Sequence, residues 1–309
     1  MLVRALTTIS SPVHARVVFV RHGQSVWNSE KKFTGWADVD MTQTGREEAA
    51  AAADQIIAHG LHFDRGFSSE LKRAQETLAI LLDRAGQRNL EVSTDWRLNE
   101  RHYGALQGSS KEDAVDRFGR EQVKRWRNSY DCAPPPAAED DLQKNPANDL
   151  RYAEVPREIL PNGESLKDTL ERCLPFWCER VEPELRDGRN VLISAHGHSI
   201  RALMKFLDGI SDDDIERVSL PNGMPLVYEL DARLQPVPLP LAERAIDACG
   251  QHSPLNAVFL GDEAELSNRL LRDAEVIGLD CPLPDTESPA RSAVRMHAND
   301  QQPAALMVS

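Results

Sequence analysis

The chain has 309 residues and a mass of 34.5 kDa, and its 36 Lys and Arg against 49 Asp and Glu give a formal net charge of −13 at pH 7. Hydrophobic residues make up 41% of the chain and charged residues 28%. This balance is typical of a globular protein with a large core and excludes a disordered, collagenous or disulfide-scaffold chain. The acidic charge argues against nucleic acid or an anionic membrane as a partner, because phosphate contacts need clustered Lys and Arg.

Short apolar runs and sparse cysteines predict a cytoplasmic protein without a membrane span. The apolar runs, such as residues 17–20, are far shorter than the roughly 18 residues of a spanning helix. Residues 1–16 lack the continuous apolar segment of a signal peptide. The cysteines are odd in number and show no Cys-x-x-Cys spacing, so we expect reduced thiols at Cys132, Cys173, Cys178, Cys249 and Cys281.

Strand and helix patterns alternate through most of the chain. Short apolar runs typical of buried strands cover residues 15–21, 63–69, 91–98, 190–195 and 225–230. Helices are predicted over residues 44–59, 70–85, 111–128, 164–186 and 199–208. The first helix is expected to open with a capping box of Thr44 and Glu47. This alternation predicts an α/β three-layer sandwich, in which helices flank both faces of a largely parallel central sheet.

Two stretches interrupt this alternation. Residues 132–163 contain Pro134-Pro135-Pro136 and an acidic patch, which suit a long surface excursion that acts as a lid or binding loop, or else is disordered. Residues 232–309 are rich in Pro and lack Lys. We expect a partly ordered tail there, with a strand and the start of a helix within residues 257–266; a partner-binding module is the alternative. The predicted division is an N-terminal extension 1–14, a catalytic domain 15–231 and a C-terminal extension 232–309.

Histidines stand at the ends of two predicted strands, where ligands gather in an α/β sheet. One strand runs into His22 and Gly23, and another into His196 and Gly197. Each glycine lets the backbone approach a ligand, and the following helix offers N–H groups to an anion. Either histidine alone is more typical of a structural or surface position, but the two together favour a site.

Arginines near these strand ends predict an anion cradle. Arg21 adjoins His22, Arg73 follows the second strand, and Arg97 and Arg101 follow the third. Guanidinium groups pair bidentately with phosphate oxygens, so the pattern indicates a phosphate site. The charged run around Arg73, taken alone, is equally typical of a solvated face.

Longer motifs then resemble one family. These motifs are the segments Arg21–Asn28, Phe33–Trp36, Arg97–Gly104, Pro161–Leu166 and Ala195–Gly197. In this order they resemble the cofactor-dependent phosphoglycerate mutases, which are members of the histidine phosphatase superfamily. The resemblance extends over about residues 16–231, and Phe-Thr-Gly-Trp and Leu-Asn-Glu-Arg-His-Tyr-Gly are its most specific parts, since Arg-His-Gly is shared by many phosphatases.

The resemblance implies a role for each matching residue. His22 would accept the phosphoryl group, while Arg21, Arg73 and His196 would stabilise its charge. Glu100 would be the general acid and base, kept protonated near neutral pH by the phosphate anions beside it; a salt-bridged surface glutamate is the alternative. The positions implied to hold the substrate are Ser25, Asn28, Thr34, Gly35, Arg101, Tyr103, Lys111, Arg127, Asn128, Gly197 and His198. Lys111 has the weakest local motif, and a solvated lysine is its alternative.

Two positions depart from the family's pattern. The mutases carry paired arginines where this chain has Arg127 and Asn128, which removes one charge-assisted contact of roughly 1.5–3 kcal/mol. Arg125 is the candidate replacement, about 60° around the helix from Asn128. His198 stands where the family has Asn, and we expect its charge to vary with pH. Both changes bear on the choice of substrate rather than on the phosphohistidine chemistry.

The leading hypothesis is a mutase that interconverts 2-phosphoglycerate and 3-phosphoglycerate, with 2,3-bisphosphoglycerate as intermediate and priming cofactor and with no metal. The alternative is a phosphatase, or a mutase, for a related phosphorylated acid. A non-catalytic binding protein is disfavoured because every chemical group is present. A metal hydrolase using the histidines and Glu100 is disfavoured because Arg21 and Arg73 would repel the cation. The expected partner is a small phosphorylated acid, and the resemblance implies a homo-oligomer, dimer or tetramer.

Overall fold

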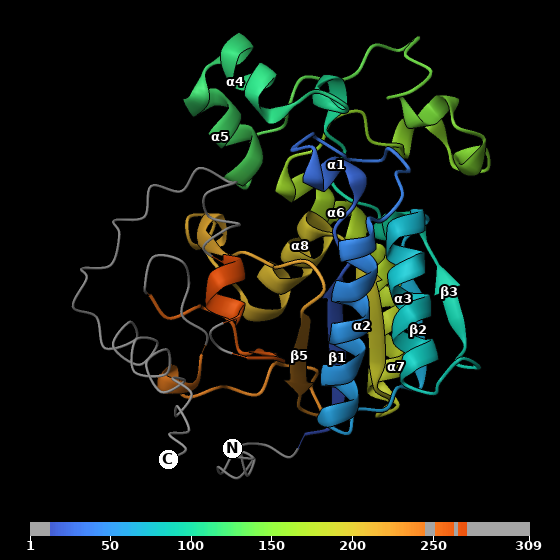
Figure 1. Ribbon diagram of the computed structural model, residues 1–309, viewed down its shortest axis with the longest axis vertical. Helices are drawn as coiled ribbons and strands as arrows, with labels where there is room; N and C mark the ends of the chain where they lie inside the picture. Colours follow the sequence, from blue (N-terminus) through green and yellow to red (C-terminus); the bar gives the residue numbers. More distant parts are fainter. Residues whose placement is uncertain (1–12, 245–250, 263–264, 271–309) are drawn as a thin grey trace, which may run out of the picture.

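The computed structural model describes residues 13–244, 251–262 and 265–270 (Figure 1). Within these ranges the strands form one six-stranded sheet in the order β3-β2-β4-β1-β5-β6. The strands are β1 (Ala15–Arg21), β2 (Arg65–Ser68), β3 (Val92–Thr94), β4 (Val191–Ala195), β5 (Pro225–Leu230) and β6 (Val258–Phe259). The neighbours from β3 to β1 pair in parallel, whereas β5 runs antiparallel to β1 and to β6. The prediction of a largely parallel sheet is confirmed.

Strand β1 lies inside the sheet, where Val17 pairs with Val191 on one side and Tyr228 on the other. Successive side chains of a strand point to opposite faces, and both faces of β1 are buried. Val17 and Phe19 belong to one apolar cluster, and Val18 and Val20 to a second. A strand covered on both faces reads as a continuous apolar run, which is why β1 is readily recognised in the sequence.

Helices cover both faces of the sheet, so the three-layer prediction is also confirmed (Figure 1). Helices α2 (Gln43–Ala58) and α3 (Lys72–Arg84) pack on the face of Val18 and Val20. Helices α6 (Leu166–Phe176), α7 (Glu182–Arg186) and α8 (Gly197–Asp208) pack on the other face. None of the helices in the described ranges is long and apolar enough to cross a membrane.

Several element boundaries differ from the predicted ones because side chains cap the backbone locally. Thr42 caps α2 by accepting a hydrogen bond from the Gly45 N–H at 3.1 Å, so the predicted capping box that starts at Thr44 is wrong. The third strand ends at Thr94 instead of residue 98, because Asp95 accepts from the Arg97 N–H and caps a 3₁₀ turn, Trp96–Leu98. Helix α8 starts at Gly197, two residues earlier than predicted.

Two predicted long helices are divided. Gly119, with φ of 81°, separates α4 (Lys111–Phe118) from α5 (Arg120–Asn128). The predicted helix 164–186 contains a π-helical turn, Trp177–Val181, between α6 and α7. Pro175 and Pro183 flank this turn, and neither has an N–H to donate to the helical hydrogen-bond ladder, which accounts for the change in register.

The excursion 132–163 lies with α4 and α5 at the end of the sheet where β1 stops and the one-turn helix α1 (Val26–Ser29) follows (Figure 1). It contains 3₁₀ turns at Pro146–Asn148, Leu150–Tyr152 and Arg157–Ile159. Tyr152 is 2% exposed, and its hydroxyl accepts from Asn99 Nδ2 at 2.9 Å. His102 Nε2 lies 2.7 Å from the Lys144 carbonyl. The excursion is therefore attached to the segment that carries Glu100.

Part of the expected C-terminal extension completes the sheet. Strand β6 pairs with β5, with Leu226 opposite Phe259, and residues 265–270 are helical, so the predicted strand and helix start are confirmed. Asp208 accepts hydrogen bonds from the Asn256 N–H and Nδ2 at 3.1 and 2.9 Å and from the Tyr228 hydroxyl at 2.7 Å. Residues 1–12 and 271–309, and with them Cys281, lie outside the described residues, as does Cys249.

Candidate active site

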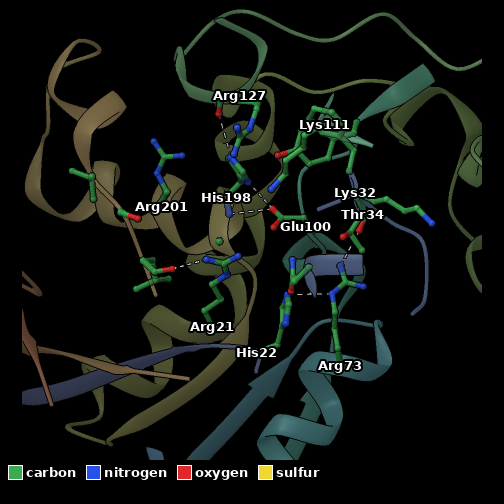
Figure 2. Close-up of a pocket in the computed structure, with 18 residues that line it drawn as sticks. Arg21, His22, Lys32, Thr34, Arg73, Glu100, Lys111, Arg127, His198 and Arg201 are labelled. Atoms are coloured by element: carbon green, nitrogen blue, oxygen red, sulfur yellow. Dashed lines mark hydrogen bonds and ion pairs between the residues drawn. The ribbon is translucent and has the colours of Figure 1, made fainter. Parts of the chain in front are cut away.

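A cavity of about 110 Å³, lined mainly by polar and charged residues, opens at the carboxyl ends of β1 and β4, and its size suits a small molecule (Figure 2). Most of the predicted site residues line it. They are Arg21, His22, Asn28, Thr34, Gly35, Arg73, Glu100, Tyr103, Lys111, Arg127, Gly197 and His198. Four predicted residues, namely Ser25, Arg101, Asn128 and His196, do not line the cavity.

His22 follows the last residue of β1, and its backbone is held on both sides. Its N–H donates to the Ala195 carbonyl at 3.0 Å, and its carbonyl accepts from Asn222 Nδ2 at 2.6 Å. In the ring, Nδ1 lies 2.7 Å from the Gly23 carbonyl and Nε2 lies 3.2 Å from Arg73 Nε. A guanidinium can only donate, so Nε2 is the acceptor and Nδ1 carries the ring proton.

The surroundings of His22 keep its ring uncharged. The side chain is buried, and burial, together with the nearby charges of Arg73 and Arg21, lowers its pKa well below the ordinary value. A neutral imidazole has a lone pair on Nε2, and that lone pair is the nucleophile of phosphohistidine chemistry. The geometry therefore presents Nε2 beside a guanidinium.

Arg73 comes from the first turn of α3 and is fully buried. Its Nη1 donates to the Ala37 carbonyl at 2.8 Å and its Nη2 to the Gly35 carbonyl at 2.9 Å. The loop that contains the Phe-Thr-Gly-Trp motif thus fixes the guanidinium in place. Burial lowers the pKa of Arg73 to about 10, so the side chain keeps its charge at neutral pH.

The His196 ring packs edge-on against the His22 ring, with 4.9 Å between the two ring centroids. Its Nε2 is 2.7 Å from Ser69 Oγ, while Nδ1 has no hydrogen-bond partner among the described residues. Burial and the charge of Arg73 lower the pKa of His196 well below its ordinary value, so this ring is also neutral.

The interpretation of Gly23 as a ligand contact is wrong. A Cβ on Gly23 would lie 2.0 Å from the carbonyl oxygen of Gly45 in α2. The glycine is therefore needed to bring the backbone after His22 against the first turn of α2. Gly197, by contrast, lines the cavity as predicted.

Glu100 is 8% exposed, and three N–H groups surround one oxygen of its carboxylate. Oε1 accepts from the Arg101 N–H at 2.8 Å and the His198 N–H at 3.0 Å, and His198 Nδ1 lies at 3.2 Å. Burial alone would raise the pKa of Glu100, but His198 and these donors outweigh it and hold the pKa well below the usual range. The prediction that phosphate anions keep Glu100 protonated near neutral pH concerns the substrate complex and stays a prediction.

A buried ion pair positions the backbone of the Glu100 segment. Arg172 Nε lies 2.6 Å from Glu164 Oε1, and both side chains are at most 5% exposed. Arg172 Nη2 donates to the Glu100 carbonyl at 3.2 Å, and Trp36 Nε1 donates to the same oxygen at 2.6 Å. The sequence reasoning did not assign Glu164 or Arg172 a role, although Glu164 lies within the Pro161–Leu166 motif.

Two of the predicted residues outside the cavity support it from behind. Ser25 caps α1 in a reciprocal pair with Asn28, whose Oδ1 accepts from the Ser25 N–H at 3.1 Å. Arg101 is fully buried, and its Nη2 contacts the Tyr103 hydroxyl, the Arg127 carbonyl and His198 Nε2 at 3.2, 3.0 and 3.1 Å.

Three further expectations around the anion cradle need revision. Arg97 belongs to no cradle, because its guanidinium pairs with Asp95 and Glu179, each at 2.8 Å. Asn128, which was expected to hold the substrate, is buried at the end of α5 and does not line the cavity. Arg125 is exposed and does not line the cavity, so it does not replace the missing arginine.

Sequence reasoning missed some lining residues. They are Lys32, Phe33, Arg201, Val218, Ser219 and Leu220. Arg201 had a usable signal, since it follows Gly197 by four residues and side chains four apart share a helix face. Val218 to Leu220 come from a loop before β5 and have no periodic pattern. Figure 2 shows Arg201 and Arg21 on one side of the cavity and Lys32, Thr34 and Lys111 on the other.

Comparison with known proteins assigns the chain to a family. Residues 17–144 and 137–235 match the model described as the histidine phosphatase superfamily (branch 1). The two matches together span more than half of the chain. The protein belongs to the histidine phosphatase superfamily.

Solved structures with the same fold include phosphatases and a mutase. A mycobacterial glucosyl-3-phosphoglycerate phosphatase is 28% identical, with a TM-score of 0.53 over 69% of this chain and 92% of that one. The alpha-ribazole phosphatase from Shigella flexneri is 21% identical, with a TM-score of 0.55 over 72% and 95% of the two chains. A phosphoglycerate mutase from Bacillus anthracis is 22% identical, with a TM-score of 0.50 over 70% and 88%. The last two comparisons bear on the fold alone.

Proposed function

We propose that the protein transfers phosphoryl groups through a phosphohistidine formed at His22. The observation that carries this proposal is the lone pair on His22 Nε2. It is assigned to Nε2 because Nδ1 contacts the Gly23 carbonyl and Nε2 accepts from the Arg73 guanidinium. Nε2 attacks the phosphorus atom, and the bond from phosphorus to the substrate oxygen breaks. Arg21, Arg73 and His196 surround the place where negative charge spreads.

Glu100 handles the proton in this scheme. It protonates the departing substrate oxygen when His22 is loaded, and it takes a proton from the accepting hydroxyl when His22 is unloaded. Because Glu100 is ionised in the structure, it needs a substrate to become an acid. The phosphate of a bound substrate raises the pKa of Glu100, because a negative charge next to a carboxylate disfavours its ionised form.

The substrate that we propose is 3-phosphoglycerate, interconverted with 2-phosphoglycerate. Six of the side chains that line the cavity are basic and one is a carboxylate; the basic ones are Arg21, Lys32, Arg73, Lys111, Arg127 and Arg201. Such an excess of positive charge suits a small acid that carries both phosphate and carboxylate groups. The mutase-like motifs around Trp36 and Glu100 support the same choice.

The same residues fit 2,3-bisphosphoglycerate as the priming cofactor. Besides the basic side chains, Thr34 Oγ1 is buried and has no partner among the described residues, as expected for a group that meets a phosphate oxygen. Lys111 and Arg127 would hold the group farther from His22. When bound, the bisphosphate would supply the phosphoryl group that loads His22.

The test is product analysis. Purified protein is incubated with 3-phosphoglycerate, with and without a trace of 2,3-bisphosphoglycerate, and both 2-phosphoglycerate and inorganic phosphate are quantified. We expect isomer formation that depends on the bisphosphate and exceeds phosphate release. If the protein releases phosphate rapidly but forms no 2-phosphoglycerate, the mutase assignment is refuted.

The second candidate is a phosphatase for a related phosphorylated acid. Asn128 favours it, because the arginine that the mutases have there is missing and Arg125 does not reach the cavity. A mycobacterial protein of the same fold, 28% identical, is a phosphatase of glucosyl-3-phosphoglycerate. Phosphate release from a panel of phosphorylated acids that exceeds isomer formation would select this candidate.

A further inference from the structure

The ring of His198 lies between the two charged side chains of neighbouring residues. Arg101 Nη2 is 3.1 Å from His198 Nε2, and His198 Nδ1 is 3.2 Å from Glu100 Oε1. Nε2 also lies 3.4 Å from the Arg127 carbonyl, but its shorter contact is with a guanidinium, which can only donate. We therefore assign the lone pair to Nε2 and the ring proton to Nδ1, directed at Glu100. The ring also stands edge-on to Tyr103, with 5.9 Å between the centroids. These contacts define both the orientation and the tautomer of His198.

We propose that His198 is a positioning residue for Glu100: it takes a hydrogen bond from Arg101 at Nε2 and gives one to Oε1, so that Oε1 stays unprotonated and the exchanged proton is carried by Oε2. The inference rests on the proposed role of Glu100 as acid and base. It differs from the expected role of position 198, which was direct contact with the substrate.

The two oxygens of Glu100 have different surroundings. Oε1 meets three N–H groups, two from the backbone and one from the His198 ring. A Cβ placed on Gly197 would lie 3.7 Å from Oε2 and 3.4 Å from Arg21 Nε, so Oε2 faces the space that Gly197 leaves beside Arg21. Both Gly197 and Arg21 line the cavity. Oε2 is thus the oxygen directed towards a substrate.

The His198 ring is neutral near pH 7. Burial and the charge of Arg101 lower its pKa to about 3, so the expectation that its charge varies with pH is wrong. A permanently neutral ring acts as a fixed donor rather than as a pH switch. Its hydrogen bond favours the carboxylate form of Glu100.

Other titratable groups also act on Glu100, and every variant at position 198 keeps them. They are the arginines Arg73, Arg172 and Arg201 and the neutral histidines His22 and His196, while the Arg101 N–H donates to the carboxylate. Lys111 and Arg127 line the same cavity. A change at His198 alone therefore isolates the contribution of its hydrogen bond.

The test follows the Glu100 carboxyl directly. The full-length protein is labelled with ¹³C at glutamate carboxyls, and the Glu100 signal is assigned by its absence in Glu100→Gln. The signal is titrated in the wild type, His198→Ala and His198→Asn. We expect His198→Ala to raise the pKa of Glu100 by about one pH unit or more, a tenfold change in the ionisation constant, because a donor to a charged group is lost. His198→Asn, whose amide still donates, should restore much of the shift.

Controls separate this outcome from a folding defect. His59→Ala replaces an exposed histidine at the end of α2 whose ring contacts the Gln55 carbonyl, and it should leave the Glu100 titration unchanged. His198→Leu is used if His198→Ala does not fold. An equal pKa of Glu100 in the wild type and in the folded donor-free variant would overturn the proposal. The titration needs no turnover, so it tests the role of His198 independently of the proposed function. The proposed function would be contradicted by a different result, namely a His22 that cannot be phosphorylated.

Discussion

Arg73 Nε donates to His22 Nε2 over 3.2 Å, and this contact joins the first turn of α3 to the end of β1. The other two nitrogens of the guanidinium are held by the Ala37 and Gly35 carbonyls. The guanidinium is therefore preorganised at the atom that we expect to accept a phosphoryl group. Preorganised charge of this kind is usually the largest contribution to catalysis, because no reorganisation is needed during the reaction.

Arg73→Lys should lower kcat by about 10²–10³-fold. A lysine keeps the charge but cannot donate to Ala37, Gly35 and His22 together, so the cation loses its fixed position. Steady-state kinetics of isomerisation and of phosphate release measure the effect. Arg46→Lys is the matched control, because Arg46 forms a half-exposed pair with Glu76 on the outside of α2 and α3. Equal activity of the two variants would contradict this role of Arg73.

Acidification should weaken the fold through buried neutral histidines. Burial lowers the pKa of His22, His102, His196 and His198. Below the unfolded pKa of about 6.5, the unfolded chain binds protons that the native state does not. The free energy of unfolding should therefore fall as the pH drops from 7 to 5.5, with a limiting slope of up to about 1.4 kcal/mol per pH unit for each histidine. Urea unfolding at several pH values measures the slope.

His198→Asn provides the internal check of this linkage. Removing one of the four groups should make the pH dependence of unfolding shallower, whereas His59→Ala, at an exposed position, should not. A free energy of unfolding that is constant from pH 7 to 5.5 would mean that these histidines have the same pKa in the native and the unfolded state, which would contradict the prediction.

Glu164→Gln should destabilise the fold by about 3–5 kcal/mol, because Arg172 would remain buried without its counter-ion. The loss should extend to activity, since Arg172 also donates to the Glu100 carbonyl. Urea unfolding gives the stability change. Glu76→Gln, which breaks the half-exposed pair with Arg46, should cost no more than about 1 kcal/mol. Similar costs for the two variants would show that the buried pair does not hold the Glu100 segment.

Asn222→Ala should reduce kcat by up to about tenfold and lower the free energy of unfolding by no more than about 1.5 kcal/mol. It removes the 2.6 Å hydrogen bond from Asn222 Nδ2 to the His22 carbonyl, and one such bond contributes about 0.5–1.5 kcal/mol. The Asn222 carbonyl accepts from Arg269 Nη1 at 2.7 Å, which ties residues 265–270 to the same loop. Arg269→Gln should show a smaller effect on kcat, because it acts one contact farther from His22. A larger loss of kcat in Arg269→Gln than in Asn222→Ala would contradict this prediction.

The sequence predicts the central strands well and the peripheral elements less well. Strands β1 and β5 have the predicted bounds, because apolar residues fill both faces of a buried strand. The edge strand β3 is shorter than predicted, since Asp95 turns the backbone into a 3₁₀ turn. A polar side chain that bonds two residues away leaves no periodic signature.

The part of the site that could be predicted from the sequence is the part formed by short motifs at the carboxyl ends of strands. His22 and His196 meet because β1 and β4 are adjacent and parallel, with Arg21 opposite Ala195. Arg172 and Glu164 were not predictable as a pair, because their importance comes from burial against the Glu100 segment. Arg97 was misplaced for a different reason: it pairs with Asp95, two residues before it, and with Glu179, which is far away in the sequence.

Phosphorylation of His22 is the most direct test of the central claim. The protein is treated with ³²P-labelled 2,3-bisphosphoglycerate or 3-phosphoglycerate, quenched in base and mapped by peptide analysis, with His22→Ala as control. The account predicts a base-stable, acid-labile label on the peptide that contains His22, and none in the variant. Phosphoryl turnover that proceeds without any label on His22, or equally well in His22→Ala, would contradict it.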